Sequence, residues 1–217
     1  MRQGLAMLLV AALSGFGMAQ AAAAEFAVRV ADARGAPVAD AVVTIVPRDA
    51  RALPAAAAPP ATHVIDQRNE TFIPYIEVFR PGDKVVFHNS DHTRHHAYSF
   101  APARQFEFVL APGESSAPLQ LDRVGVIAVG CNIHDRMITY FYVTDAPVSA
   151  RTQGDGIARV ALPAGGYDVR VWHPRQRPGA ADTARTVTID DAPADAAFAL
   201  TLLPDPRGAP DRERSSY

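Results

Sequence analysis

The chain has 217 residues, 48% of them hydrophobic, which is enough for one large or two small domains with buried cores. Its formal net charge is -2, so the sequence offers neither the basic surface of a nucleic-acid-binding protein nor a strongly acidic face. A single cysteine, Cys131, excludes an internal disulfide. Partners must therefore be inferred from a specific site and not from overall charge.

The first residues have the pattern of an export signal. Arg2 supplies a positive start, residues 5–16 are apolar, and a run of alanines ending near Ala24 offers small-residue cleavage sites. The apolar run is shorter than the roughly 18 residues that a membrane-spanning helix needs. We expect residues 1–24 to be removed on export to the periplasm, leaving a mature chain without a membrane span.

Beyond the signal, short runs rich in β-branched and aromatic residues alternate with polar residues and end at Pro, Gly, Asp or Asn. This pattern predicts an all-β protein. The expected strands are 26–31, 41–47, 63–67, 75–79, 84–88, 97–100, 106–110, 125–130, 138–144, 157–162, 167–173, 186–189 and 196–202.

The first two predicted strands, 26–31 and 41–47, are joined by a turn-forming stretch and read as a hairpin. An isolated hairpin is marginal in water, and the last strands of the chain also lack partners. We therefore expect a discontinuous β-sandwich formed by residues 25–47 plus 148–202. A second, Greek-key sandwich at 62–146 would be inserted into it.

Two segments have too few apolar residues to form part of a core. Residues 48–61 are rich in Ala and Pro and are predicted to be a linker. Residues 203–217 carry prolines and charges and are predicted to be a disordered tail.

A possible metal site lies in the loop between the strands predicted at 125–130 and 138–144. Within seven residues this loop carries Cys131, His134 and Met137. Two imidazoles and a thiolate with a weak axial thioether suit copper in a blue electron-transfer centre, whereas zinc rarely takes a thioether. The second imidazole must come from elsewhere. Three candidates follow the strand predicted at 84–88: His92, His95 and His96.

Two stretches near these histidines form a recognisable pattern: Pro-Gly-Asp-Lys-Val-Val-Phe-His-Asn at 81–89 and His-Ala-Tyr-Ser-Phe at 96–100. They resemble the plastocyanin, pseudoazurin and amicyanin pattern of a turn, a strand, an Asn and a ligand His that opens a hydrophobic strand. The Cys-x2-His-x2-Met spacing and the Pro-Tyr-Ile-Glu-Val run at 74–78 are similar to amicyanin. The resemblance covers about residues 63–145 and identifies this part as a member of the cupredoxin family.

The resemblance implies one type 1 copper ion bound by His96, Cys131, His134 and Met137. His96 fits the family pattern because the hydrophobic residue four places on is then Phe100. Alternation weakly supports this choice, since both would share one face of the strand. His95 remains the alternative ligand.

One position departs from the family. Ala97 stands where many cupredoxins carry an Asn whose side chain ties the two ligand loops together. Groups of this kind orient the ligands and adjust the reduction potential of the metal, so the sequence does not determine that potential.

The remaining strands resemble a different sandwich. Residues 38–44 and 162–169 are similar to the carboxypeptidase-regulatory or transthyretin-like family. The whole arrangement resembles exported proteins described as methylamine utilization proteins. That description does not by itself establish a role in methylamine metabolism.

These observations predict a monomeric periplasmic protein that carries single electrons between redox proteins. Docking would be small and transient and would centre on His134, which in the family shows its ring edge through an apolar patch. No nucleic-acid partner is expected, and no Ser-His-Asp order or phosphate loop indicates an enzyme. The alternatives are a copper chaperone, sensor or buffer without electron transfer, and a sandwich module that binds a surface or another protein.

Overall fold

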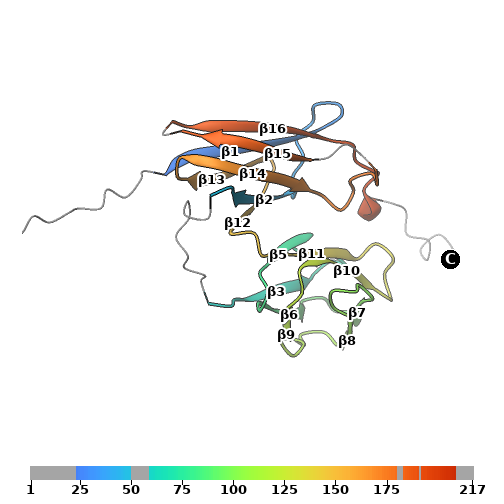
Figure 1. The fold of residues 1–217 in the computed structure, drawn as a ribbon. Coiled ribbons are helices and arrows are strands. Elements are labelled where there is room, and N and C mark those ends of the chain that lie inside the picture. Colours follow the sequence, from blue (N-terminus) through green and yellow to red (C-terminus); the bar gives the residue numbers. More distant parts are fainter. Residues whose placement is uncertain (1–22, 50–58, 180–182, 191, 209–217) are drawn as a thin grey trace, which may run out of the picture.

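The structure is a computed structural model that describes residues 23–49, 59–179, 183–190 and 192–208. Residues 1–22 of the predicted signal, 50–58 of the predicted linker and 209–217 of the predicted tail lie outside these ranges. The described chain is all-β, as predicted, with its strands in four sheets and a single 3-10 turn at Pro206–Gly208 (Figure 1). None of its described helices is long and apolar enough to cross a membrane.

Strands from the two ends of the chain form one pair of sheets, which we call the outer sandwich. One sheet has the order β13-β1-β16 and the other β12-β2-β14-β15, and side chains from both form one apolar core. The strands are β1 (Ala24–Asp32), β2 (Val42–Pro47), β12 (Val148–Arg151), β13 (Ile157–Leu162), β14 (Gly165–Trp172), β15 (Ala184–Ile189) and β16 (Ala194–Leu200).

The prediction that β1 and β2 form a hairpin is wrong. β1 pairs with β13 and β16, whereas β2 pairs with β12 and β14, so the two strands lie in opposite sheets. Val28 of β1 and Val43 of β2 are both fully buried in the shared core. The segment between the strands therefore crosses from one sheet to the other, because each strand buries its apolar face against the opposite sheet.

Residues between these strands form a second pair of sheets, the inner sandwich. Its sheets have the orders β4-β3-β6-β9 and β5-β11-β10-β7-β8, and their shared core includes Cys131 and Met137. The strands are β3 (Thr62–Gln67), β4 (Phe72–Ile73), β5 (Ile76–Phe79), β6 (Lys84–Asn89), β7 (His95–Ser99), β8 (Phe106–Leu110), β9 (Leu119–Gln120), β10 (Gly125–Cys131) and β11 (Ile138–Val143).

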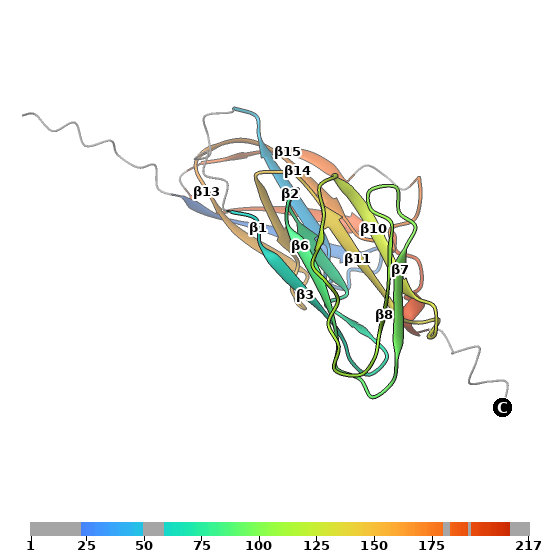
Figure 2. The same cartoon turned by 90° about the horizontal axis from the view of Figure 1, so that it is seen from below.

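The two sandwiches pack against each other through an aromatic layer. Tyr140 and Tyr142, on the face of β11 turned away from the inner core, contact Trp172 of β14, with the Tyr142 and Trp172 ring centroids 5.0 Å apart. Figure 1 shows β11 on the side of the inner sandwich that faces strands β2 and β14, and the two sandwiches are superimposed in the view of Figure 2. The packing fixes how the outer sandwich lies relative to the inner one.

The start of the predicted disordered tail is ordered, so that prediction is wrong for residues 203–208. The Leu203 amide donates to the Arg175 carbonyl at 2.7 Å. Arg207 pairs with Asp205 at 2.7 Å, and its guanidinium lies 3.5 Å from the Tyr75 ring centroid. Composition misses this order because the segment is held by hydrogen bonds, an ion pair and a cation–π contact, and not by apolar burial.

A buried hydroxyl joins two parts of the outer sandwich that are distant in sequence. Thr152 Oγ1 accepts from the Ala41 amide at 2.9 Å and donates to the Val38 carbonyl at 2.7 Å. Replacing Thr152 by Val keeps the side-chain shape and leaves both backbone groups without this partner. We expect Thr152→Val to lower the free energy of unfolding by about 1–3 kcal/mol, measured by urea denaturation.

Thr152→Ser is the matched control because it keeps the hydroxyl. It should lie much closer to the wild type than Thr152→Val does. Equal unfolding midpoints for the two variants would show that the hydroxyl does not stabilise this junction.

Candidate metal centre

Strand pairing brings the two halves of the candidate site together. β7 and β10 are antiparallel neighbours, with Cys131 opposite Ala97. The first residue of β7, His95, therefore lies beside the last residue of β10, Cys131. The loop 132–137 then carries His134 back over the same end of the sheet before β11 begins.

Backbone hydrogen bonds hold this loop in place. The Cys131 amide donates to the Met137 carbonyl at 3.1 Å, and the Met137 amide donates to the His134 carbonyl at 3.1 Å. At the other edge, the Asn132 amide donates to the His96 carbonyl at 3.0 Å. The loop is thus closed at its base and tied to β7, which fixes the direction of its side chains.

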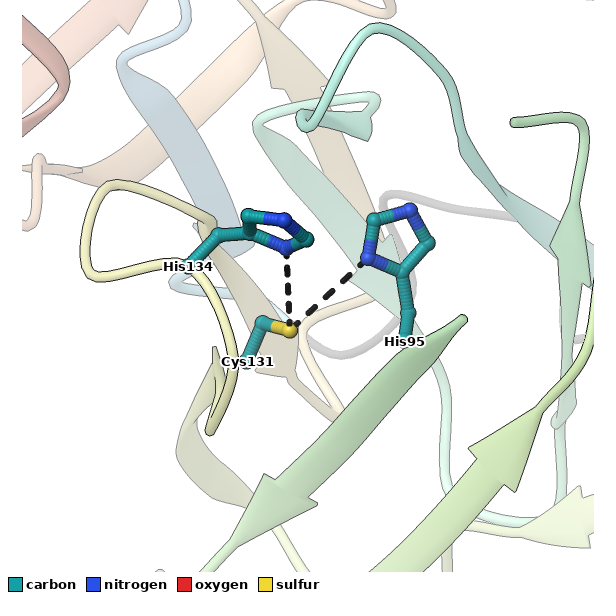
Figure 3. A group of neighbouring side chains, drawn as sticks. All are labelled: His95, Cys131 and His134. Carbon is teal, nitrogen blue, oxygen red and sulfur yellow. Dashed lines mark hydrogen bonds between the residues drawn. The ribbon is translucent and has the colours of Figure 1, made fainter. Parts of the chain in front are cut away.

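Three potential ligand atoms converge in this region (Figure 3). The Cys131 sulfur lies 3.9 Å from His95 Nδ1 and 3.8 Å from His134 Nδ1. All three atoms lie within 4.8 Å of one another. In the part of the chain that the structure describes, these three side chains are the cluster of His, Cys, Asp or Glu that could hold a metal ion. His95 and Cys131 are buried, so the site is largely shielded from water.

The spacing and the donor set fit a metal ion. Metal–nitrogen and metal–sulfur bonds of about 2.0 and 2.3 Å at angles of about 110–120° place nitrogen and sulfur about 3.5–3.7 Å apart. The two distances at Cys131, 3.9 and 3.8 Å, lie just above this range. A thiol has one hydrogen and can satisfy only one of the two imidazoles, whereas a cation is bound by all three atoms.

Met137 lies in the same apolar cluster as Cys131 and is almost fully buried. Its backbone closes the loop, as described above. The residue that carries the thioether is therefore buried in the same core as the cysteine. This arrangement is compatible with the weak axial ligand predicted from the sequence.

The structure places His95, and not His96, in this group, which corrects the preferred ligand of the sequence analysis. His95 shares the inner face of β7 with the buried Ala97 and Ser99. His96 lies on the outer face, with its Nε2 3.5 Å from a Glu107 carboxylate oxygen. The alternative named from the sequence, His95, is therefore the histidine that faces Cys131.

The error has a physical cause. The sequence favours His96 because it fits the family pattern and shares one face of the strand with Phe100. Phe100 is instead 79% exposed, and the inner face carries small residues. Alternation along a strand means that a shift of one residue exchanges the two faces.

Asp91 is a residue of the site that sequence reasoning missed. Its carboxylate accepts a hydrogen bond from His95 Nε2 at 2.8 Å, which leaves Nδ1 of the same ring to face the sulfur. Burial alone would raise the Asp91 pKa, but hydrogen bonds from the Glu70 amide, His95 and the Asn69 amide outweigh it and lower the pKa. Its position four residues before a candidate ligand is the sequence signal that could have identified it.

His134 is the most accessible of the three, with a side chain that is 18% exposed and an Nε2 atom 3.9 Å from Glu70 Oε1. It lines a cavity of about 240 Å³. The other lining residues are polar or charged: Asn69, Glu70, Thr71, Arg136 and Arg207. The ring edge of His134 is thus reached through polar side chains.

Comparison with known proteins returns structural likenesses only. No protein-family model and no curated protein matches the chain. Amicyanin from Paracoccus versutus is 15% identical with a TM-score of 0.35 and matches 46% of this chain and 98% of that one.

A copper-containing nitrite reductase from Thermus scotoductus is 22% identical with a TM-score of 0.34, over 47% of this chain and 26% of that one. A variant of amicyanin in the Cu(I) state is 15% identical with a TM-score of 0.35, over 38% and 82%. We therefore base the functional proposal on the side chains of the site.

The assignment of the two adjacent histidines can be tested by substitution. We expect His95→Ala to weaken Cu(II) binding by well over tenfold, because it removes a nitrogen that faces Cys131. His96→Ala should leave the affinity nearly unchanged, because that ring points to Glu107. Competition titration with a chelator measures both, and a larger loss in His96→Ala would refute the placement.

Proposed function

We propose that this protein is a cupredoxin-type carrier of single electrons with one type 1 copper ion. The observation that carries the proposal is the convergence of His95, Cys131 and His134, with the buried Met137 in the same loop. Two imidazoles, a thiolate and a thioether form the donor set typical of blue copper centres. A bound copper ion would supply the one-electron Cu(II)/Cu(I) couple.

The role of the chain is to hold these donor groups in one arrangement. His95 and Cys131 are carried on paired strands, and hydrogen bonds close the loop that carries His134 and Met137. A close-packed surrounding resists movement of the side chains embedded in it. Donor groups that are held in this way would keep nearly the same positions in both oxidation states, so electron transfer would require little rearrangement.

Burial also protects the thiolate. Cys131 is buried and is the only cysteine of the chain, so no second thiol of the same chain competes with a metal for it. In an oxidising compartment an unbound thiol risks oxidation or pairing with another chain. Metal ligation agrees with the export to the periplasm that we propose from residues 1–24.

Electrons would enter and leave through His134, the ligand residue with the most exposed side chain. Its accessible edge opens on the polar cavity shared with Glu70 and Arg136. We propose transient docking of redox proteins at this edge, as is usual for small electron-transfer interfaces.

The outer sandwich would be transthyretin-like, as the sequence resemblance implies.

The visible spectrum gives the first test. Copper-loaded wild-type protein should show the intense absorption of a copper thiolate, and Cys131→Ser should abolish it, because an alcohol oxygen does not replace thiolate as a donor to copper. His96→Ala serves as the control and should retain the band. A wild-type protein that binds copper without this band would contradict the proposed centre.

The second candidate function is copper binding without electron transfer, as in a chaperone or buffer. The observation that favours it is the polar cavity at His134, through which a metal could be exchanged. Voltammetry of the copper-loaded protein separates the two functions. An electron carrier should give a reversible one-electron couple and retain its copper over repeated cycles, whereas a chaperone should lose copper to a competing chelator during cycling.

A further inference from the structure

The buried imidazole of the metal centre is held from behind by a carboxylate. His95 Nε2 lies 2.8 Å from Asp91 Oδ2, and the side chains are 0% and 13% exposed. Since Asp91 can only accept when ionised, this contact places the ring hydrogen on Nε2. The lone pair of Nδ1 is then directed to the side where Cys131 lies.

The carboxylate is itself fixed by backbone donors from another part of the chain. The amides of Asn69 and Glu70 donate to the two Asp91 oxygens at 2.5 and 2.9 Å. Both residues have positive φ angles, 53° and 54°, a conformation that non-glycine residues rarely adopt. Two consecutive amides turned in this way form a small site for a negative charge.

The loop that carries Asp91 is equally constrained. Its amide donates to Asn89 Oδ1 at 2.9 Å, and Asn89 is fully buried. The Asn89 side chain in turn donates to the carbonyls of Thr93 and Leu110 at 2.8 and 3.0 Å. Asp91 is therefore held by residues outside the group that would bind the metal.

We propose that Asp91 is a positioning residue that, through His95, selects the Nε2–H tautomer and lowers the reduction potential of the copper centre. The proposal rests on the proposed function. A carboxylate partner makes an imidazole a stronger donor, and a buried negative charge stabilises the higher metal charge more than the lower one. Asp91 thus favours Cu(II) over Cu(I).

Two other acid–histidine pairs provide matched controls. Glu107 faces His96 at 3.5 Å on the outer side of β7, and its side chain is largely exposed. Glu70 lies 3.9 Å from His134 Nε2, too far for a hydrogen bond, and its side chain is 32% exposed. Each has the same chemistry as the Asp91–His95 pair without its contact to a buried ligand ring.

The experiment compares Asp91→Asn, Glu107→Gln and Glu70→Gln with the wild type. Asp91→Asn should weaken Cu(II) binding about 10- to 100-fold, the usual effect of removing such a partner. Cu(I) binding should weaken less, so the potential should rise, by about 59 mV for each tenfold difference. Glu107→Gln should leave the potential unchanged, and Glu70→Gln should shift it less than Asp91→Asn.

A measurement without copper separates this proposal from the proposed function. Nitrogen-15 NMR of the metal-free wild type should show His95 as the Nε2–H tautomer. Asp91→Ala, which removes the acceptor, should lose this preference, while Glu107→Gln keeps it. Circular dichroism shows whether each variant is folded. If Asp91→Ala does not fold, Asp91→Asn takes its place, because it retains one side-chain oxygen for the backbone amides.

A blue wild-type protein whose potential and tautomer are unaffected by both Asp91 variants would overturn the proposal and leave electron transfer standing. Absence of the copper-thiolate band would overturn the proposed function instead. In that case the tautomer measurement still decides whether Asp91 positions His95.

Discussion

The candidate site depends on one constraint, the antiparallel pairing of β7 with β10. This pairing places the start of one strand beside the end of the other, so that His95 and Cys131 meet although they are 36 residues apart. The loop after Cys131 needs only to fold back on itself to add His134, and its backbone hydrogen bonds do this. The strands therefore determine the positions of two donors, and the loop supplies the others.

The all-β class and most strands could be predicted because alternation and turn residues are local signals. Cys131, His134 and Met137 could also be found, since they lie close together in sequence. The short strands β4 and β9, and β12 with its sequence Val-Ser-Ala-Arg, carry too little alternation to be recognised. Their pairing depends on neighbours that are distant in the chain.

The choice between His95 and His96 could not be made from sequence because it depends on which face of β7 is buried. The aromatic residues Tyr98 and Phe100 lie outside, whereas Ala97 and Ser99 lie inside with His95, opposite to the usual preference for buried aromatic residues. The role of Asp91 was hidden for a related reason. Its contacts with Asn69 and Glu70 join two loops that are separated by β4, β5 and β6.

The outer sandwich reaches the edge of the metal centre through its C-terminal segment. Arg207 stacks on Tyr75 and lines the same cavity as His134. The aromatic layer around Trp172 holds the two sandwiches together on the neighbouring face of β11. The outer sandwich thus contributes a residue to the cavity at His134, where we propose that redox partners dock.

The proposed copper ion would be bound between β7 and the loop after β10. Crystallography of the copper-loaded protein at the copper absorption edge, in both oxidation states, can locate this ion. We expect one anomalous peak within bonding distance of Cys131 Sγ, His95 Nδ1 and His134 Nδ1, with nearly the same ligand positions in each state. A peak at His96, or loss of a ligand on reduction, would contradict it.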